Sequence, residues 1–361
     1  MSATSKLHDL GQSLWLDNIT RDLLDSGTLA RYVGELSVTG LTSNPTIFEK
    51  ALAESPAYDA AILGRRRDNV GTEGLFFELA LEDLTRAADL FRGIFERTNG
   101  VDGWVSLEVS PLLAYDAART LSEAKRLHAL ANRPNLLIKI PGTREGLPAI
   151  EEAIFAGVPI NVTLLFSHDQ YSAAADAYLR GIERRIAAGL NPEVASVASL
   201  FVSRWDVAVA GQVPAALRNR LGIAVAKQTY AAYRAWLESP RVQRVCNFGG
   251  RPQRLLWAST GTKDPAASPT LYVEALAAPL TVNTVPEQTL KAVAALGDAR
   301  AALDAAGGDF AAVSADFARA GIDAGALAVR LQAEGAAAFV KSWNALLKGL
   351  DAKRSALAKT A

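Results

Sequence analysis

The chain has 361 residues, half of them hydrophobic, and its 38 basic and 38 acidic side chains give a formal net charge of zero. Without a basic field or a Lys/Arg-rich tract, nucleic-acid binding is not expected, and the single cysteine, Cys246, excludes an intramolecular disulfide and a cysteine-rich metal site. The N-terminus lacks the apolar core of a signal peptide and no stretch is apolar for long enough to span a membrane, so we expect a soluble cytoplasmic protein.

Short apolar segments alternate with helical patterns along the chain. Turn-forming residues bound these segments, as is typical of buried strands in a parallel sheet. The predicted strands cover residues 13–17, 38–45, 103–111, 136–140, 157–167, 194–201, 254–259 and 278–283. Helices are expected at about 18–34 with a break at Gly27, after Pro45, and at 74–99, 114–131, 143–155, 167–186 and 224–238, with Thr143 and Ser167 as N-caps.

Eight strand–helix units in succession predict a closed (β/α)8 TIM barrel. A doubly wound open sheet is the alternative. The sequence contains neither GxGxxG nor GxxxxGK[ST], so nothing supports a nucleotide-binding open sheet. From Pro286 onward the Ala-rich sequence predicts helices, with breaks at Gly297, Gly307–Gly308 and Gly321. We interpret residues from about 303 to 361 as additional helices packed on one barrel domain that spans residues 1–361.

Lys139 stands inside the apolar segment 136–140. A buried ammonium is costly, so such a lysine usually pairs with a carboxylate or extends to solvent. The other interpretation is a water-poor pocket that favours the neutral amine, which adds to a ketone and forms a Schiff base. The residues at the ends of the other strands decide between these interpretations.

Polar side chains occur at or near the ends of most predicted strands. In a barrel these ends face a common site, where the polar groups would satisfy each other and a polyhydroxylated ligand. No histidine cluster accompanies the carboxylates, so a metal site is not expected, and His128 and His168 fall in helical segments, which argues against Ser-His-Asp catalysis. The strand-end residues are Asp17, Thr42, Asn44, Glu108, Lys139, Asn161, Thr163, Ser199, Ser259 and Asn283.

Six motifs together resemble those of the transaldolase family. The resemblance runs from about Ser13 to Asn283 and beyond. It implies an α/β barrel that transfers a dihydroxyacetone unit between sugar phosphates of the pentose phosphate pathway, through a lysine Schiff base and without a cofactor. The motifs are LDN at 16–18, GLTSNP at 40–45, SLEV at 106–109, LIKIPGT at 137–143, NVTLLFS at 161–167 and SLFVSR at 199–204.

The resemblance also implies roles for individual residues. Lys139 matches the Schiff-base lysine and Asp17 the acid–base residue. Glu108 matches a carboxylate that works through a water molecule together with Thr163. The expected substrate-binding residues are Thr42, Asn44, Asn161, Ser199, Phe201, Arg204, Ser259 and Lys263.

The expected phosphate ligands include one departure from the family pattern. Arg204 matches a phosphate ligand, although an arginine at this position would also suit an ion pair with Asp206. Many members have a second phosphate-binding arginine after the seventh strand, where this chain has Gly261, with Lys263 as the nearest cation. Lysine binds phosphate as a point charge without the fork of arginine. This segment resembles that of a longer transaldolase subgroup.

Two other functions remain as alternatives. Related aldolases release dihydroxyacetone to water, but they are shorter and tend to have Gln and Tyr where this chain has Glu108 and Phe201, so transfer is favoured. A catalytically silent sugar-phosphate binder would need none of Lys139, Asp17 and Glu108. The sequence is compatible with a monomer or a homodimer.

Overall fold

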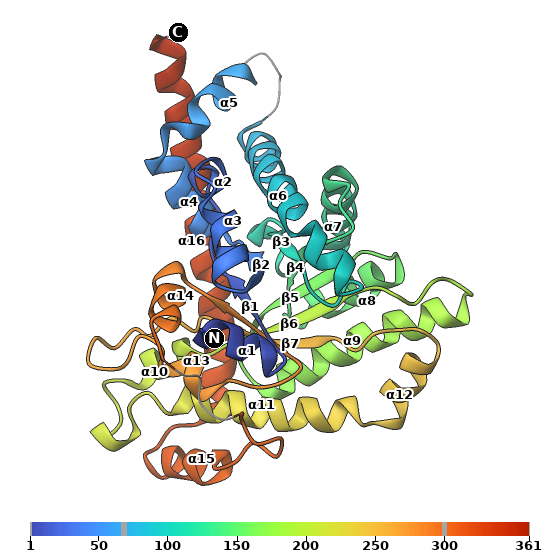
Figure 1. Cartoon of the computed structure of the whole chain (residues 1–361), viewed down its shortest axis with the longest axis vertical. Coiled ribbons are helices and arrows are strands. Elements are labelled where there is room, and N and C mark those ends of the chain that lie inside the picture. Colours follow the sequence, from blue (N-terminus) through green and yellow to red (C-terminus); the bar gives the residue numbers. More distant parts are fainter. Residues whose placement is uncertain (1, 66–70, 298–301, 361) are drawn as a thin grey trace.

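The computed structural model describes residues 2–65, 71–297 and 302–360. Its strands form a closed barrel in sequence order, in which every neighbouring pair is parallel and β1 pairs with β8. The (β/α)8 prediction is therefore confirmed, and the open doubly wound sheet was wrong (Figure 1). The strands are β1 Gln12–Leu16, β2 Val38–Thr42, β3 Val105–Glu108, β4 Leu136–Pro141, β5 Ile160–Leu165, β6 Ser196–Phe201, β7 Arg254–Ala258 and β8 Thr281–Val285.

Helices follow the strands and surround the barrel (Figure 1). Within the described residues, short 3-10 turns also occur at Pro56–Tyr58, Pro111–Leu113 and Ala215–Leu217. The α-helices are α1 Ala3–Asp9, α2 Arg21–Asp25, α3 Thr28–Glu35, α4 Pro45–Glu54, α5 Asp59–Gly64, α6 Thr72–Arg97, α7 Ala117–Ala131, α8 Gly146–Phe155, α9 His168–Ala187, α10 Ser203–Val209, α11 Leu221–Leu237, α12 Pro240–Asn247, α13 Leu271–Ala275, α14 Glu287–Ala294, α15 Phe310–Arg319 and α16 Ala324–Thr360.

Local sequence explains the helices that follow the first two strands. Gly27 adopts a left-handed conformation with φ of 70° and separates α2 from α3, as predicted. Asn44 Oδ1 accepts a hydrogen bond from Ile47 N at 3.1 Å, and Pro45 occupies the first turn of α4. The Asn-Pro sequence therefore fixes the point at which the chain leaves β2 and turns back along the barrel.

Two predicted N-caps differ in detail from the structure. Helix α8 begins at Gly146 rather than beside Thr143, because residues 144–145 form a turn, although Thr143 Oγ1 accepts a hydrogen bond from Gly146 N at 3.0 Å. Ser167 caps α9 as predicted, and its Oγ accepts from Gln170 N at 3.2 Å. The Gln170 side chain, however, accepts from Phe166 N rather than from the N–H of Ser167.

Successive side chains of each strand point to opposite faces of the barrel wall, and the buried apolar residues therefore form two clusters. Ile138 and Ile140 belong to the cluster between the barrel and its helices, whereas Leu137 belongs to the cluster that includes the barrel interior. Because successive strand residues face opposite sides, Lys139 shares the inward face with Leu137. The strand pattern thus directs the lysine into the barrel.

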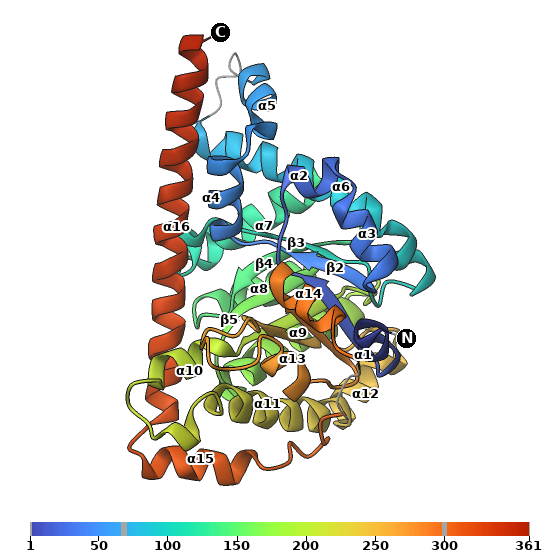
Figure 2. The ribbon, with the colours of Figure 1, turned by 60° about the vertical axis from the view of Figure 1, so that its left-hand side comes forward.

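The C-terminal helices pack on the barrel as expected. Gly307, Gly308 and Gly321 have positive φ and lie before α15 and between α15 and α16. Residues 302–306 form no helix, contrary to the prediction of helix between the breaks, and residues 298–301 lie outside the described residues. Figure 2 shows α16 along one side of the molecule, with α10 near its start and α4 and α5 beside its later turns.

Helix α16 is joined to the C-terminal ends of two strands. Gln332 Nε2 donates to Gly142 O at 3.0 Å and to Leu164 O at 2.9 Å. Further along the helix, Ser342 Oγ accepts from Thr46 Oγ1 of α4 at 2.9 Å. These bonds hold α16 across the mouth of the barrel.

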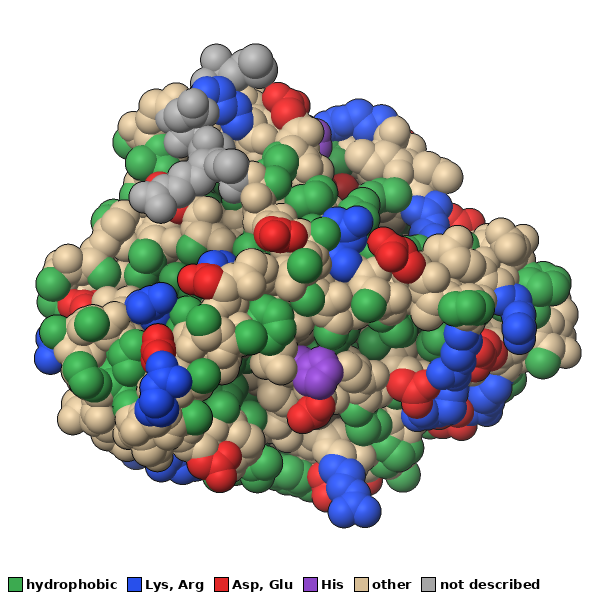
Figure 3. Space-filling view, turned by 90° about the horizontal axis from the view of Figure 1, so that it is seen from below, with side chains coloured by type: hydrophobic (Ala, Val, Ile, Leu, Met, Phe, Trp, Pro, Cys, Tyr) green, Lys and Arg blue, Asp and Glu red, His purple; other side chains and the backbone are tan. Residues whose placement is uncertain are grey.

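The described surface shows no concentration of one charge on the face drawn in Figure 3, where Lys and Arg side chains are interspersed with Asp and Glu. Within the described ranges, no helix has both the length and the apolarity needed to cross a membrane.

The contacts of Gln332 predict a stabilising role for its amide. Replacing Gln332 by Ala leaves two carbonyl oxygens without their donor, so we expect the free energy of unfolding to fall by about 1–2 kcal/mol in urea titrations. Gln243→Ala is the matched control, because the exposed Gln243 amide donates to a single carbonyl, Leu237 O. Equal effects of the two substitutions would contradict the proposed tie between α16 and the barrel.

Candidate active site

A cavity of about 350 Å³ lies at the C-terminal end of the barrel. Strands β1, β2, β4, β6, β7 and β8 or the loops after them all contribute side chains to it. The predicted site residues line it with the exception of Glu108, Asn161 and Thr163, which lie on strands beside Lys139. The fold therefore brings together side chains that the sequence places more than 200 residues apart.

Lys139 is buried beside a carboxylate. Glu108 lies opposite Lys139 in the β3–β4 ladder, with Lys139 Nζ 3.6 Å from Glu108 Oε2. Nζ also donates a hydrogen bond to Ser43 O at 3.1 Å. The two charged side chains are only 6% and 4% exposed, so the alternative of a lysine extending to solvent is wrong. The amine is held in a water-poor interior at the edge of the cavity.

The carboxyl group of Glu108 is a weaker acid than an ordinary glutamate side chain. Burial raises the pKa of Glu108 to about 7, and the negative charge of Asp17 acts in the same direction, whereas Lys139 opposes both. The 3.6 Å separation from Lys139 is too long for a hydrogen bond, and neither carboxylate oxygen finds another partner among the described residues. Near neutral pH this carboxyl group can therefore both accept and donate a proton.

Asp17 follows β1 and faces the same cavity. Thr42 Oγ1 donates to Asp17 Oδ1 at 2.7 Å, and the Thr42 hydroxyl lies 2.6 Å from Thr284 Oγ1. Burial raises the pKa of Asp17, although the charge of Lys139, the Thr42 hydrogen bond and the charge of Lys263 each act against this rise. The Thr42 contact fixes one oxygen of Asp17 and leaves the carboxylate directed at the cavity.

A hydrogen-bonded group lies on the other side of Lys139. Asn161 is paired with Lys139 in the β4–β5 ladder, and its amide donates to Ser106 Oγ at 3.1 Å and accepts from Ser199 Oγ at 2.7 Å. Two residues further along β5, buried Thr163 Oγ1 has no hydrogen-bond partner in the described chain. The Asn161 amide is thus fixed in orientation, and Thr163 is free to bind a substrate or a water molecule.

Three cationic side chains stand at the rim of the cavity. Arg204 lies in the first turn of α10, Lys263 in the loop after β7 and Lys50 on α4. All three are exposed, and within the described ranges none of them forms an ion pair. The rim therefore presents positive charge to an incoming anion.

The alternative of an ion pair between Arg204 and Asp206 is not what the structure shows. Asp206 is buried, and its oxygens accept hydrogen bonds from the N–H groups of Leu221 and Gly222 at 2.9 and 3.3 Å and from the Tyr272 hydroxyl at 2.9 Å. The Asp206 carboxylate thus accepts hydrogen bonds from the first N–H groups of α11 and does not pair with Arg204. The Arg204 guanidinium remains available at the cavity.

The loop after β7 holds Lys263 close to Gly261, the position at which many family members have an arginine. Ser259 has a left-handed backbone with φ of 55°, and its Oγ lies 3.0 Å from Ser203 Oγ. A Cβ atom placed on Gly261 would lie 3.6 Å from Lys263 Nζ. The ammonium therefore lies beside the place that a side chain at position 261 would take, where Pro286 Cγ, 3.0 Å from such a Cβ, is also close.

The sequence analysis missed several residues that line the cavity, among them Thr284, Lys50 and Phe339, and it placed one strand-end residue wrongly. Strand β8 begins at Thr281, after the left-handed backbone of Leu280. Val282 belongs to the cluster that includes the barrel interior, so by alternation Thr284 rather than Asn283 faces the cavity. Asn283 Oδ1 accepts from Thr260 Oγ1 at 3.0 Å outside the site. Lys50 lies one helical turn after Ile47 in α4 and was recognisable from that spacing, whereas nothing in the sequence places Phe339 of α16 here.

Within the described ranges, no group of three or more His, Cys, Asp or Glu side chains is arranged to hold a metal ion.

Comparison with known proteins identifies similar chains. Residues 14–350 match the family described as transaldolase/fructose-6-phosphate aldolase. Two proteins named transaldolase, from Thiobacillus denitrificans and Thermobifida fusca, are each 45% identical over 96% of this chain and over 99% and 96% of their own lengths. Transaldolase 1 of Streptomyces coelicolor is 42% identical over 97% of this chain and 96% of its own length.

The raised pKa of Glu108 predicts a pH-dependent stability. Between its ordinary value of 4.5 and about 7, the folded protein holds a proton that the unfolded chain has released, so ionisation of Glu108 destabilises the fold as the pH rises. The Glu108→Gln variant lacks this titration. From below pH 4.5 to above pH 7, we expect its free energy of unfolding to improve relative to the original protein by on the order of 3 kcal/mol. Urea titrations across this range test the point, and a constant difference between the two proteins would refute it.

Proposed function

The chain belongs to the transaldolase/fructose-6-phosphate aldolase family, and we propose that it acts as a transaldolase. In this reaction a dihydroxyacetone unit moves from sedoheptulose 7-phosphate or fructose 6-phosphate to erythrose 4-phosphate or glyceraldehyde 3-phosphate. The observation that carries the proposal is the buried Lys139 amine, 3.6 Å from Glu108 in the barrel interior and in one cavity with Asp17. A cationic rim above these residues suits phosphorylated substrates.

Lys139 is the proposed nucleophile in the first step. Its Nζ bonds to the ketone carbon and loses a proton, and the carbonyl oxygen takes up two protons and leaves as water. Glu108 exchanges these protons, because a carboxyl group with a pKa of about 7 is present in both forms near neutral pH. The unpartnered hydroxyl of Thr163 is the proposed second contact for the water that relays them.

Asp17 is the proposed base for cleavage of the carbon–carbon bond. It removes the proton from the hydroxyl group next to that bond, the bond breaks with its electrons passing into the iminium, and an aldose phosphate leaves. Burial raises the pKa of Asp17 and so makes it a stronger base than an exposed carboxylate. With the acceptor aldose phosphate the same atoms move in reverse, and Asp17 returns the proton to the new hydroxyl group.

The remaining polar residues are proposed to position the sugar. Thr42, Asn44 and Ser199 line the cavity, and the orientation of Asn161 is fixed by its two hydrogen bonds. Arg204, with Ser259, is proposed to bind the phosphate group that donor and acceptor both carry at the end remote from the carbonyl. Lys263 is proposed to replace the second arginine, because its Nζ lies 3.6 Å from the place of a Cβ atom at Gly261 and Lys263 lines the same cavity.

Transfer is favoured over release of dihydroxyacetone. Glu108 and Phe201 both match the transferring members of the family and not the shorter aldolases. Phe201 packs against Phe166 with ring centroids 5.2 Å apart, and Phe339 from α16 lies at the same cavity. These aromatic side chains limit the access of water to the three-carbon unit on Lys139.

Borohydride trapping tests the role of Lys139. With fructose 6-phosphate and borohydride, we expect covalent labelling at position 139 by a three-carbon unit. Lys139→Arg should abolish both labelling and turnover, because the guanidinium stays protonated. Asp17→Asn is the matched control, since it should still form the Schiff base but trap the uncleaved sugar phosphate, which a mass spectrum distinguishes. Label mapped to another lysine, such as Lys263, would refute the assignment.

Substrate kinetics test the phosphate site. Loss of a charge-assisted hydrogen bond costs about 1.5–3 kcal/mol, so Arg204→Ala should raise the KM for fructose 6-phosphate by about tenfold or more. The slow reaction of unphosphorylated fructose should remain nearly unchanged, and Lys263→Ala should show the same pattern more weakly. Arg97→Ala, at an exposed arginine on α6, controls for the loss of one surface charge. Equal losses on fructose and fructose 6-phosphate would show that Arg204 does not bind the phosphate.

A further inference from the structure

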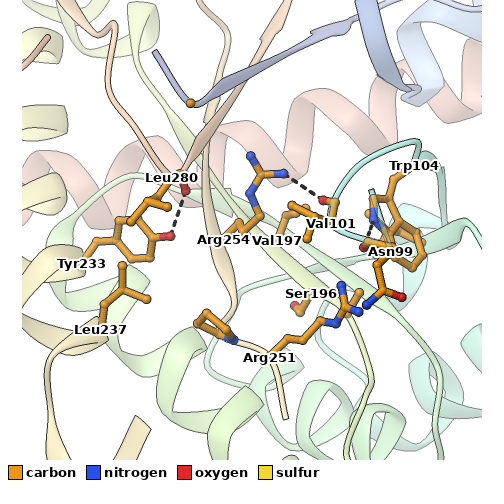
Figure 4. A pocket seen from close by; sticks show the side chains of 15 residues that line it. Asn99, Val101, Trp104, Ser196, Val197, Tyr233, Leu237, Arg251, Arg254 and Leu280 are labelled. Carbon is orange, nitrogen blue, oxygen red and sulfur yellow. Dashed lines mark hydrogen bonds between the residues drawn. The ribbon is translucent and has the colours of Figure 1, made fainter. Parts of the chain in front are cut away.

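The N-terminal end of the barrel holds a second cavity, which the transfer reaction does not use. Its volume is about 590 Å³, within the range of roughly 300–1,000 Å³ typical of small-molecule sites. It is formed where the chain enters the strands, around residues 99–101, 195–197 and 251–254 (Figure 4). In TIM-barrel enzymes the catalytic groups lie at the opposite end, so this cavity is separate from the proposed active site.

The lining of this cavity is mostly apolar. Figure 4 shows Tyr233, Leu237 and Leu280 on one side and Asn99 and Trp104 on the other. Val101 and Leu280 also line it and are 51% and 50% exposed, which is unusual for large apolar side chains at the edge of a concave site. An apolar ligand body would cover them.

Arg254 supplies a guanidinium whose hydrogen-bond partners are all neutral. Its Nη1 donates to Val101 O at 3.0 Å, and its Nη2 donates to Ser13 Oγ at 2.8 Å and to Thr281 O at 2.9 Å. No carboxylate of the described chain lies within ion-pair distance of it. These bonds hold the guanidinium in place while its charge remains directed at the cavity.

The carboxylates associated with the two arginines of this cavity are not among its described lining residues. Asp102 is buried behind Arg254, and Ser13 Oγ, which accepts from Arg254, donates in turn to Asp102. Arg251 pairs with Glu193, which does not line this cavity. The described lining therefore contains two arginines and no acidic side chain.

We propose that this cavity binds a small amphipathic anion, with an aromatic or aliphatic body and one carboxylate, sulfonate or phosphate group. The body would displace water from the apolar lining, and the anionic group would accept charge-assisted hydrogen bonds from the arginines. The proposal does not depend on the transfer reaction at the other end of the barrel.

Fluorescence titration of the whole protein with 8-anilinonaphthalene-1-sulfonate tests this site. We expect saturable binding of one equivalent that fructose 6-phosphate does not displace. The neutral analogue N-phenyl-1-naphthylamine has the same ring system without the sulfonate and should bind at least about tenfold more weakly, as should the sulfonate to Arg254→Gln.

Substitutions at Leu280 test the site without disturbing the fold. Leu280 has a left-handed backbone with φ of 65°, which Asp and Asn tolerate better than Leu. Leu280→Asp should weaken sulfonate binding more than Leu280→Asn does. The Asp and Asn side chains have nearly the same shape, but only Asp adds a negative charge. Val329→Asp, at a position that is 67% exposed on α16, should leave binding unchanged.

Several outcomes would overturn the proposal. They are absence of saturable binding, displacement of the probe by fructose 6-phosphate, equal binding of the neutral analogue, and equal effects of Leu280→Asp and Val329→Asp. If Arg254→Gln fails to fold, the comparison of Leu280→Asp with Leu280→Asn still decides the question.

Discussion

The burial of Lys139 is the constraint on which the arrangement of the site depends. An amine in the interior of a barrel needs partners, and here Ser43 O and Glu108 provide them. Glu108 lies opposite Lys139 in the β3–β4 ladder, so the sheet holds the backbones of the two residues side by side. The same burial makes the Glu108 carboxyl harder to ionise, and thus places the proposed nucleophile beside a group whose pKa of about 7 suits proton exchange near neutral pH.

The two ends of the barrel use buried polar groups in different ways. At the C-terminal end, the carboxylate oxygens of Glu108 and the hydroxyl of Thr163 accept or donate no hydrogen bond within the described part of the chain, and Glu108 is held only by its ion pair with Lys139. At the N-terminal end, the carboxylate of Asp102 is fully engaged, by the Ser13 hydroxyl, by Trp15 Nε1 and by a backbone N–H. One end is therefore suited to chemistry, and the other stabilises the barrel while presenting the charge of Arg254 at its rim.

Tertiary contacts decided between interpretations that the local sequence left open, and they corrected the position of the last strand. Asp206 follows Arg204 by two positions, but its carboxylate caps α11 because the unpaired N–H groups of Leu221 and Gly222 are the better partners in a buried setting. The last strand was expected too early, because the apolar residues before it resemble strand residues. The left-handed backbone of Leu280 precedes the strand, and Thr284 shares the inward face with Val282, so Thr284 lies at the cavity where Asn283 was expected.

The sequence by itself determined the barrel and most of the candidate site. Strand alternation and strand ends are local features, and in a closed parallel barrel they suffice to direct Asp17, Glu108 and Lys139 to one place. Only the tertiary structure decided what covers that place. The apolar face of α16 indicates that the helix is buried, but not which surface it meets, so the arrival of Phe339 at the cavity depends on contacts such as those of Gln332 with Gly142 and Leu164. The spacing of apolar residues in the sequence indicates that a side chain is buried. Which residues it packs against is decided only when the whole chain has folded.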